Sequence, residues 1–267
     1  MKRLLLICAT GLVVTACATT TSPTGRTQTV GAVSQQQLNQ LGAEAFQQYK
    51  TQQPLSRDST QNSYVRCVVN AVVRELPASA QSGWDVALFS NDSPNAFALP
   101  GGKVGVYTGI FKAARNQDQL AAVIAHEVGH VVARHHDERI TRQYGAQAGL
   151  GIVGAIVGSQ YGANAAQTAQ QLGGAALQAT FLLPNSRTQE TEADIVGQQL
   201  MAEAGFDPRE AVSLWQNMIS AGGSQGPEWL STHPNPQSRI AELGARAASL
   251  VPIYEQARRE GKRPDCG

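Results

Sequence analysis

The sequence His126-Glu127-Val128-Gly129-His130 follows an apolar run over residues 120–125, so we expect both to lie on one mostly buried helix. Residues i and i+4 lie one above the other on an α-helix, and both imidazoles can therefore reach one metal ion. The Glu127 carboxylate lies about 100° round the helix and can reach a water on that metal. Because burying these groups without a partner would be costly, we expect one zinc ion per chain here.

A second acidic stretch, Glu190-Thr191-Glu192-Ala193-Asp194, is expected on another helix. A catalytic zinc needs a third protein ligand and an open fourth position for water. Glu190 and Asp194 share one helix face at i and i+4, whereas Glu192 points elsewhere. The stretch can therefore supply the third ligand, and Glu190 and Glu192 compete for that role.

Four helices are predicted from an N-cap side chain that is followed three residues later by Gln. Their N-cap pairs are Ser34 and Gln37, Asp58 and Gln61, Asn116 and Gln119, and Ser186 and Gln189. We expect these helices to end near Lys50, before Pro77, near His136 and at Gly205. A fifth helix is expected with Pro208 at its first position.

Strands are expected between the second and third helices. Residues 84–89 alternate apolar and polar side chains, as a half-buried strand does. Residues 96–99 and 103–107 flank Pro100-Gly101-Gly102, which is typical of a hairpin turn. These segments predict a small antiparallel sheet.

The motifs together resemble those of the M48 family of zinc metallopeptidases, in which HExxH is followed some sixty residues later by ExEADxxG, here residues 190–197. The resemblance includes residues 95–102 and 106–109, and Ser231-Thr232-His233-Pro234 with Arg239. It implies an α+β, predominantly helical zincin fold of the gluzincin type, with a small antiparallel sheet and an HExxH active-site helix.

The resemblance also implies a role for each matching residue. His126 and His130 match the two His ligands, and Glu190 matches the third ligand. Glu127 matches the general base, and Asp194 matches the carboxylate that orients a ligand His.

Two further residues, His233 and Arg239, are expected beside the zinc by the same resemblance. His233 would either donate a hydrogen bond to the oxyanion or occupy the open zinc position at rest. The alternative is a loop His that packs locally. His135 and His136, just past the HExxH motif, are expected to face solvent at the end of the helix.

The N-terminus is expected to be an export signal. Lys2 and Arg3 precede an apolar stretch over residues 4–14, which is too short for a bilayer span. Val14-Thr15-Ala16-Cys17 resembles a lipobox, so we expect Cys17 to be acylated at the outer membrane, facing the periplasm. The alternative is an ordinary secretory signal that ends near a Cys.

Three regions are therefore expected along the chain: a lipoprotein signal peptide at 1–16, a flexible tether at 17–33 and an M48-like peptidase domain at 34–267. Residues 144–178, rich in Gly, Ala and Gln, predict a lid or helical hairpin, with a plain packed helix pair as the alternative. Cys67 and Cys266 remain after export, and in an oxidising compartment they predict a disulfide; the alternative is two free thiols.

The functional expectation is a zinc endopeptidase that cleaves misfolded or misassembled envelope proteins. The net charge of +1 argues against nucleic-acid binding through bulk charge. Since no apolar span follows the signal, the chain resembles the soluble periplasmic lipoprotein branch of the family. An assembly factor or chaperone for outer-membrane proteins is the alternative, and the outer-membrane assembly machinery is a candidate partner in either case.

Overall fold

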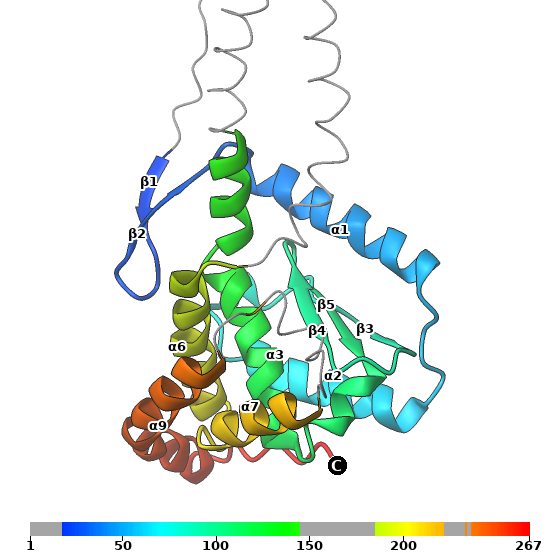
Figure 1. Ribbon diagram of the computed structural model, residues 1–267, viewed down its shortest axis with the longest axis vertical. Coiled ribbons are helices and arrows are strands. Elements are labelled where there is room, and N and C mark those ends of the chain that lie inside the picture. Colours follow the sequence, from blue (N-terminus) through cyan, green and yellow to red (C-terminus); the bar gives the residue numbers. More distant parts are fainter. Residues whose placement is uncertain (1–17, 145–184, 222–232, 234–235) are drawn as a thin grey trace, which may run out of the picture.

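The computed structural model describes residues 18–144, 185–221, 233 and 236–267 (Figure 1). Helix α3 (Gln117–Val132) lies at the centre of the fold. It contacts α2 (Ser59–Val73), α6 (Arg187–Glu203), α7 (Glu210–Ala221) and strand β4 (Ala96–Leu99). Helix α9 (Pro236–Arg259) packs on α6 and α7. Consistent with this position, every α3 residue from Gln119 to His130 is buried.

The main sheet has three strands in the order β3-β5-β4, with β3 at Asp85–Phe89 and β5 at Lys103–Tyr107. Strands β4 and β5 form the predicted antiparallel hairpin. Strand β3 pairs with β5 in parallel, however, so the sheet is mixed and the expectation of a wholly antiparallel sheet was wrong. The chain reverses twice between β3 and β5, which leaves them parallel, and β5 then inserts between the other two strands.

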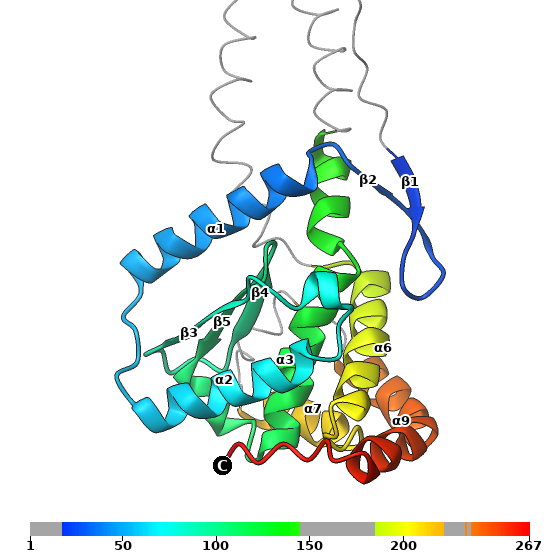
Figure 2. The same ribbon diagram turned by 180° about the vertical axis from the view of Figure 1, so that it is seen from behind.

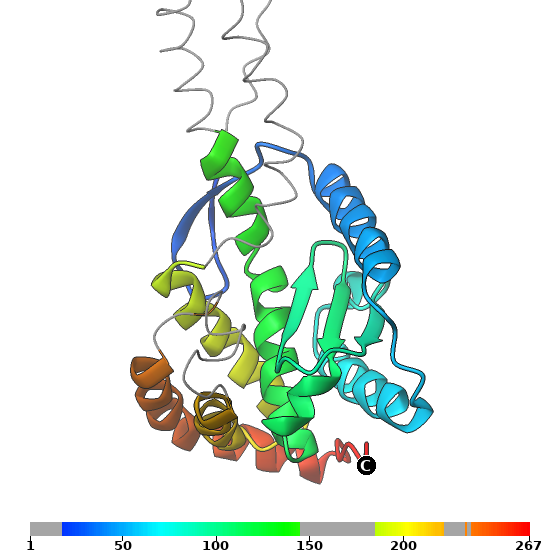
Figure 3. The ribbon, with the colours of Figure 1, turned by 45° about the vertical axis from the view of Figure 1, so that its right-hand side comes forward.

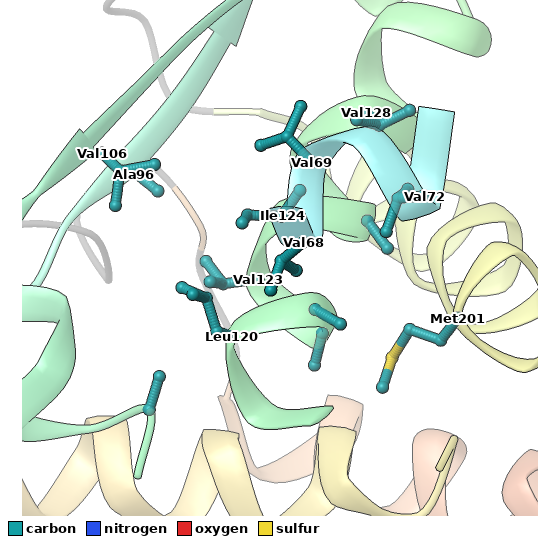
Figure 4. Close-up of a cluster of buried hydrophobic side chains, with 14 of the residues drawn as sticks. Val68, Val69, Val72, Ala96, Val106, Leu120, Val123, Ile124, Val128 and Met201 are labelled. Carbon is teal, nitrogen blue, oxygen red and sulfur yellow. The ribbon is translucent and has the colours of Figure 1, made fainter. Parts of the chain in front are cut away.

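The two faces of this sheet pack against different helices, as Figure 3 shows. Helix α1 (Gln35–Gln52) covers one face, where Phe46 meets Phe89, Leu99 and Tyr107. The other face belongs to the main core. This core draws on α2, α3, α6 and the sheet (Figure 4), and its labelled members are Val68, Val69, Val72, Ala96, Val106, Leu120, Val123, Ile124, Val128 and Met201. Alternation along each strand thus supplies both faces.

The four predicted N-caps are confirmed, because each cap side chain accepts a hydrogen bond from the backbone N–H of the Gln three residues on. Helix α2 ends at Val73, before Pro77 as predicted. Two other helix bounds differ from the prediction. Helix α7 begins at Glu210, with Pro208 in the preceding turn. Helix α3 ends at Val132, because Arg134 adopts a left-handed conformation with φ of 57°. A separate helix then covers residues 135–144.

The segment expected as a flexible tether is a docked hairpin in the structure. Strands β1 (Ala18–Thr21) and β2 (Thr27–Val30) pair antiparallel beside α6 and the helix over 135–144 (Figure 1). The backbone N–H of Gly31 donates to Asp137, 2.9 Å away, and Val30 is buried. The polar composition of residues 18–33 suggested a tether, but polar groups of this segment form hydrogen bonds with residues far away in the sequence.

Some expectations concern residues outside those described. The signal peptide at 1–16 and the predicted acylation site Cys17 are among them, as is the predicted lid apart from Tyr144. No helix in the described part of the chain combines the length and apolar composition that a bilayer span needs.

A disulfide joins Cys67 on α2 to Cys266, across 199 residues of sequence, as expected. It holds the C-terminus beside α2, which Figure 2 shows from behind. In the chain-entropy model, closing a loop of this length contributes roughly 5 kcal/mol to stability. The C-terminal segment is also held by a hydrogen bond from the Cys266 N–H to Gln117 at 3.0 Å.

Candidate metal centre and active site

Four buried side chains converge on one point: His126 and His130 from α3, Glu190 from α6, and His233. Each offers one ligand atom, and these atoms all lie within 4.8 Å of one another. Helices α3 and α6 carry three of the four. The HExxH spacing places both imidazoles on the α3 face that meets α6, as the sequence predicts.

The spacing of these atoms fits a tetrahedral zinc ion. His126 Nε2 lies 3.1 Å from His130 Nε2, and the Glu190 carboxylate oxygens lie 3.5 and 3.4 Å from the same two nitrogens. Ligands bound about 2.0–2.1 Å from a tetrahedral zinc are themselves about 3.3 Å apart. Two imidazoles and a carboxylate are also the donor set of many catalytic zinc sites. The residues present therefore fit zinc.

The electrostatics of the cluster suit a cation. Burial raises the pKa of Glu190, but His233, His126 and His130 lower it by more. The pKa therefore lies well below its usual value, and the carboxyl remains ionised. Burial lowers the pKa of His130 well below its usual value, which keeps that imidazole neutral. Burial and Arg239 also lower the pKa of His126, but Asp194 and Glu190 outweigh them and raise it to about 9. A metal that binds His126 therefore displaces its proton.

Asp194 and Arg239 hold this arrangement in place. Asp194 Oδ1 lies 3.0 Å from His126 Nδ1, which leaves Nε2 directed at the metal position. Arg239 donates to both Asp194 oxygens at 2.6 Å and to Glu190 at 2.5 Å. Its guanidinium lies over the Trp215 ring, 3.8 Å from the ring centroid. Both residues thus lie beside the metal position, as the family resemblance implied.

The fourth member of the cluster, His233, lies between the other ligand atoms and Glu127. His233 Nδ1 is 3.2 Å from His126 Nε2 and 3.0 Å from each Glu190 oxygen, so His233 lies where a fourth ligand would bind. Its other nitrogen, Nε2, is 3.4 Å from Glu127 Oε1. Glu127 is thus next to the cluster without belonging to the ligand set, as a general base requires.

Glu192 points away from the metal position, and this supports Glu190 as the third ligand. Its carboxylate accepts hydrogen bonds from Thr24 at 2.6 Å and Arg26 at 2.8 Å, and it lies 3.0 Å from His135 Nε2.

The expectation that His135 and His136 face solvent was wrong, since both are buried. On a continuous helix His135 would lie about 140° round from His130. The break at Arg134 redirects the chain instead, so that His135 Nδ1 lies 2.7 Å from His130 Nδ1. No glycine or proline marks this break, so nothing in the local sequence indicated it.

The fold and the site together define a zinc metallopeptidase of the HExxH class with a glutamate as third ligand. This chain belongs to peptidase family M48, whose family model matches residues 59–247.

The chain is similar to a mitochondrial protease and to a bacterial protease. It is 41% identical over 182 residues to the mitochondrial metalloendopeptidase OMA1 of Schizosaccharomyces pombe, covering 67% of this chain and 51% of that protein. It is 32% identical over 226 residues to the beta-barrel assembly-enhancing protease of Escherichia coli, covering 82% of this chain and 45% of that protein. The chain thus spans about half the length of these relatives.

Proposed function

We propose that this protein is a zinc-dependent endopeptidase, anchored by lipid on Cys17 to the periplasmic face of the outer membrane, that cleaves misfolded or misassembled envelope proteins. The observation that carries the catalytic part is Glu127, a buried carboxylate beside the cluster of His126, His130 and Glu190. A structural zinc would not need this base, whereas hydrolysis does.

The chemistry follows from the positions of the chain's own groups. Zinc, when bound, lowers the pKa of a water molecule and polarises the scissile carbonyl. Glu127 accepts a proton from the attacking water and passes it to the amine as the peptide C–N bond breaks. Asp194 and Arg239 keep His126 and Glu190 in place during these steps. No covalent acyl-enzyme is required.

Strand β4 supports an extended, unfolded substrate. Among the described residues it pairs only with β5, and it also contacts α3, the helix that carries HExxH. A peptide that adds to the edge of β4 opposite β5 would be bound through its backbone, with little selection of sequence. This mode suits an enzyme that acts on misfolded chains of many sequences.

The envelope setting is supported by the lipobox-like Val14-Thr15-Ala16-Cys17 and by the name of the Escherichia coli relative, which connects that protein with β-barrel assembly. The same name favours a second candidate function, an assembly factor for outer-membrane proteins with little proteolysis. The outer-membrane assembly machinery is a candidate partner under either function.

The test compares the wild-type chain with Glu127→Gln on unfolded outer-membrane proteins, with bound zinc measured in both. Cleavage by the wild type alone supports the endopeptidase. Equal assistance to barrel assembly by both proteins, without cleavage, would favour the assembly factor. Anchoring is tested separately with Cys17→Ser, which should lose acylation and leave the membrane fraction. An unchanged membrane fraction after alkaline extraction would contradict the lipid anchor.

A further inference from the structure

Each of the two histidine ligands is contacted at Nδ1, the ring nitrogen that does not face the metal position. His126 Nδ1 contacts Asp194, and Arg239 holds Asp194. For His130, a second histidine lies between the ligand and the carboxylate. His130 Nδ1 contacts His135 Nδ1 at 2.7 Å, and His135 Nε2 contacts Glu192 Oε2 at 3.0 Å. His135 and Glu192 are buried, with exposed fractions of 0% and 2%.

Glu192, the last residue of this chain of contacts, accepts hydrogen bonds from the N-terminal hairpin. Arg26 donates to Glu192 Oε2 from Nε at 3.0 Å and from Nη2 at 2.8 Å. The hydroxyl of Thr24 donates to the other oxygen, Oε1, at 2.6 Å. Both residues belong to the turn between β1 and β2, more than 160 residues from Glu192 in sequence.

We infer that Arg26 is a positioning residue for the zinc ligand His130, acting through Glu192 and His135. An ionised carboxylate only accepts hydrogen bonds, so His135 must carry its proton on Nε2 to donate to Glu192. His135 Nδ1 is then an acceptor, and His130 must donate to it from Nδ1. This leaves His130 Nε2 unprotonated and directed at the metal position, the form that binds zinc.

Arg26 also fixes the two elements that carry this relay relative to each other. Its Nη1 and Nη2 donate to Glu138 at 2.8 and 2.9 Å, and Glu138 lies on the same helix as His135. Glu192 lies on α6. One guanidinium therefore spans the helix of His135 and the helix of Glu192, and a planar fork of five donors suits this task.

The inference concerns the metal site alone and does not depend on which substrate the enzyme cleaves. The experiment uses the full chain and the variants Arg26→Ala, His135→Phe and the double variant. Zinc affinity is measured by competition with a chelator, and ligand geometry by the visible absorption spectrum of the Co²⁺-substituted protein. The control is Arg209→Ala, which removes a similar forked pair with Asp207 at the exposed start of α7.

Loss of an outer partner of a metal ligand costs about 10- to 100-fold in affinity. We expect Arg26→Ala to weaken zinc binding about 10-fold and to change the Co²⁺ spectrum, and His135→Phe to weaken it at least as much. Because Arg26 acts through His135, the double variant should bind zinc no more weakly than His135→Phe alone. Arg209→Ala should match the wild type.

A purely structural role for Arg26 gives a different result. Arg26→Ala would then lower the melting temperature but leave zinc affinity and the Co²⁺ spectrum unchanged, and this would overturn the inference. The inference would also be overturned if the fold-losses of zinc affinity in the two single variants multiplied in the double variant, since the two residues would then act independently. If Arg26→Ala does not fold, Thr24→Val removes one hydrogen bond to Glu192, and the same comparison with His135→Phe applies.

Discussion

Gly197 of α6 packs directly against the backbone of His126 of α3. A Cβ atom added at Gly197 would lie 2.8 Å from the backbone nitrogen of His126, closer than real Cβ contacts come. A Cβ atom added at Gly129 of α3 would likewise lie 2.8 Å from Ala193 O of α6. The two helices therefore meet almost backbone to backbone, which places Glu190 and Asp194 opposite the histidines of α3.

Gly197→Ala should accordingly damage both the fold and the metal site. The new methyl group must push α6 away from α3, and overpacking of this kind costs about 1–3 kcal/mol. Since Glu190 moves with α6, zinc affinity should fall as well. Urea unfolding and zinc competition measure the two effects.

Gly244→Ala on α9 is the matched control for this substitution. Among the described residues, a Cβ there meets only Val212 Cγ2, at 3.8 Å, which is an ordinary contact. Replacing a helical Gly by Ala then stabilises by about 0.5–1 kcal/mol. Equal behaviour of the two variants would show that the α3–α6 approach does not constrain the site.

Glu127→Gln should retain zinc and the fold while peptidase activity falls by about 10² to 10⁴ or more, because the amide cannot accept the proton of the attacking water. Zinc content is measured by metal analysis and activity with an unfolded protein substrate. Full turnover by this variant would remove Glu127 from the mechanism.

Glu190→Ala should instead lose the metal. Outer partners of metal ligands contribute about 10- to 100-fold in affinity, and we expect removal of a ligand itself to cost more. Glu203→Ala is the control, because Glu203 lies on the same helix and, within the part of the chain that the structure describes, its carboxylate accepts a hydrogen bond only from Gln199. Stoichiometric zinc in Glu190→Ala at low free metal would show that the assigned third ligand is wrong.

The features that the sequence predicted well depend on local patterns. The N-cap pairs, the HExxH spacing and the i, i+4 face of Glu190 and Asp194 are set by neighbours within one or two helical turns. The parallel pairing of β3 with β5 was missed because it depends on how two reversals combine. The position of His135 was missed because Arg134 breaks the helix without a glycine.

The N-terminal hairpin shows the same limit most clearly. Residues 18–33 have the composition of a linker, and the contacts that dock their hairpin are with residues more than 100 positions away, such as Glu138 and Glu192. Ion pairs of this kind have no local signature. A polar N-terminal segment that contains an arginine can therefore pack against the residues that support a metal ligand.

Acid should remove part of the stability that the hairpin contributes. Burial raises the pKa of Glu138, but hydrogen bonds from Arg26 and Gln189 lower it more, so that it lies below its usual 4.5. A lowered pKa in the folded state means that the stabilisation is complete above the unfolded-state pKa and is lost as the pH falls through the folded-state value.

Glu138→Gln tests this dependence, because glutamine does not titrate. With a chelator present to keep zinc out of the measurement, the wild type should be more stable than Glu138→Gln to urea near neutral pH. The difference should shrink as the pH is lowered below about 4.5. A difference that stays constant down to about pH 3 would mean that the charge of Glu138 contributes nothing.

His233→Ala distinguishes two roles for the histidine that lies 3.2 Å from His126 Nε2 and 3.0 Å from Glu190. As a hydrogen-bond donor to the oxyanion, His233 would support catalysis, and its loss would lower activity by about 10² to 10³. As a resting ligand it would block the position that water needs, and its loss would raise basal proteolysis. We expect the increase, because His233 contacts the ligand atoms themselves and not only Glu127. Initial cleavage rates and zinc affinity of wild type and variant decide between them. Reduced activity would assign the donor role, and unchanged activity with unchanged zinc affinity would leave His233 as a loop residue that packs locally.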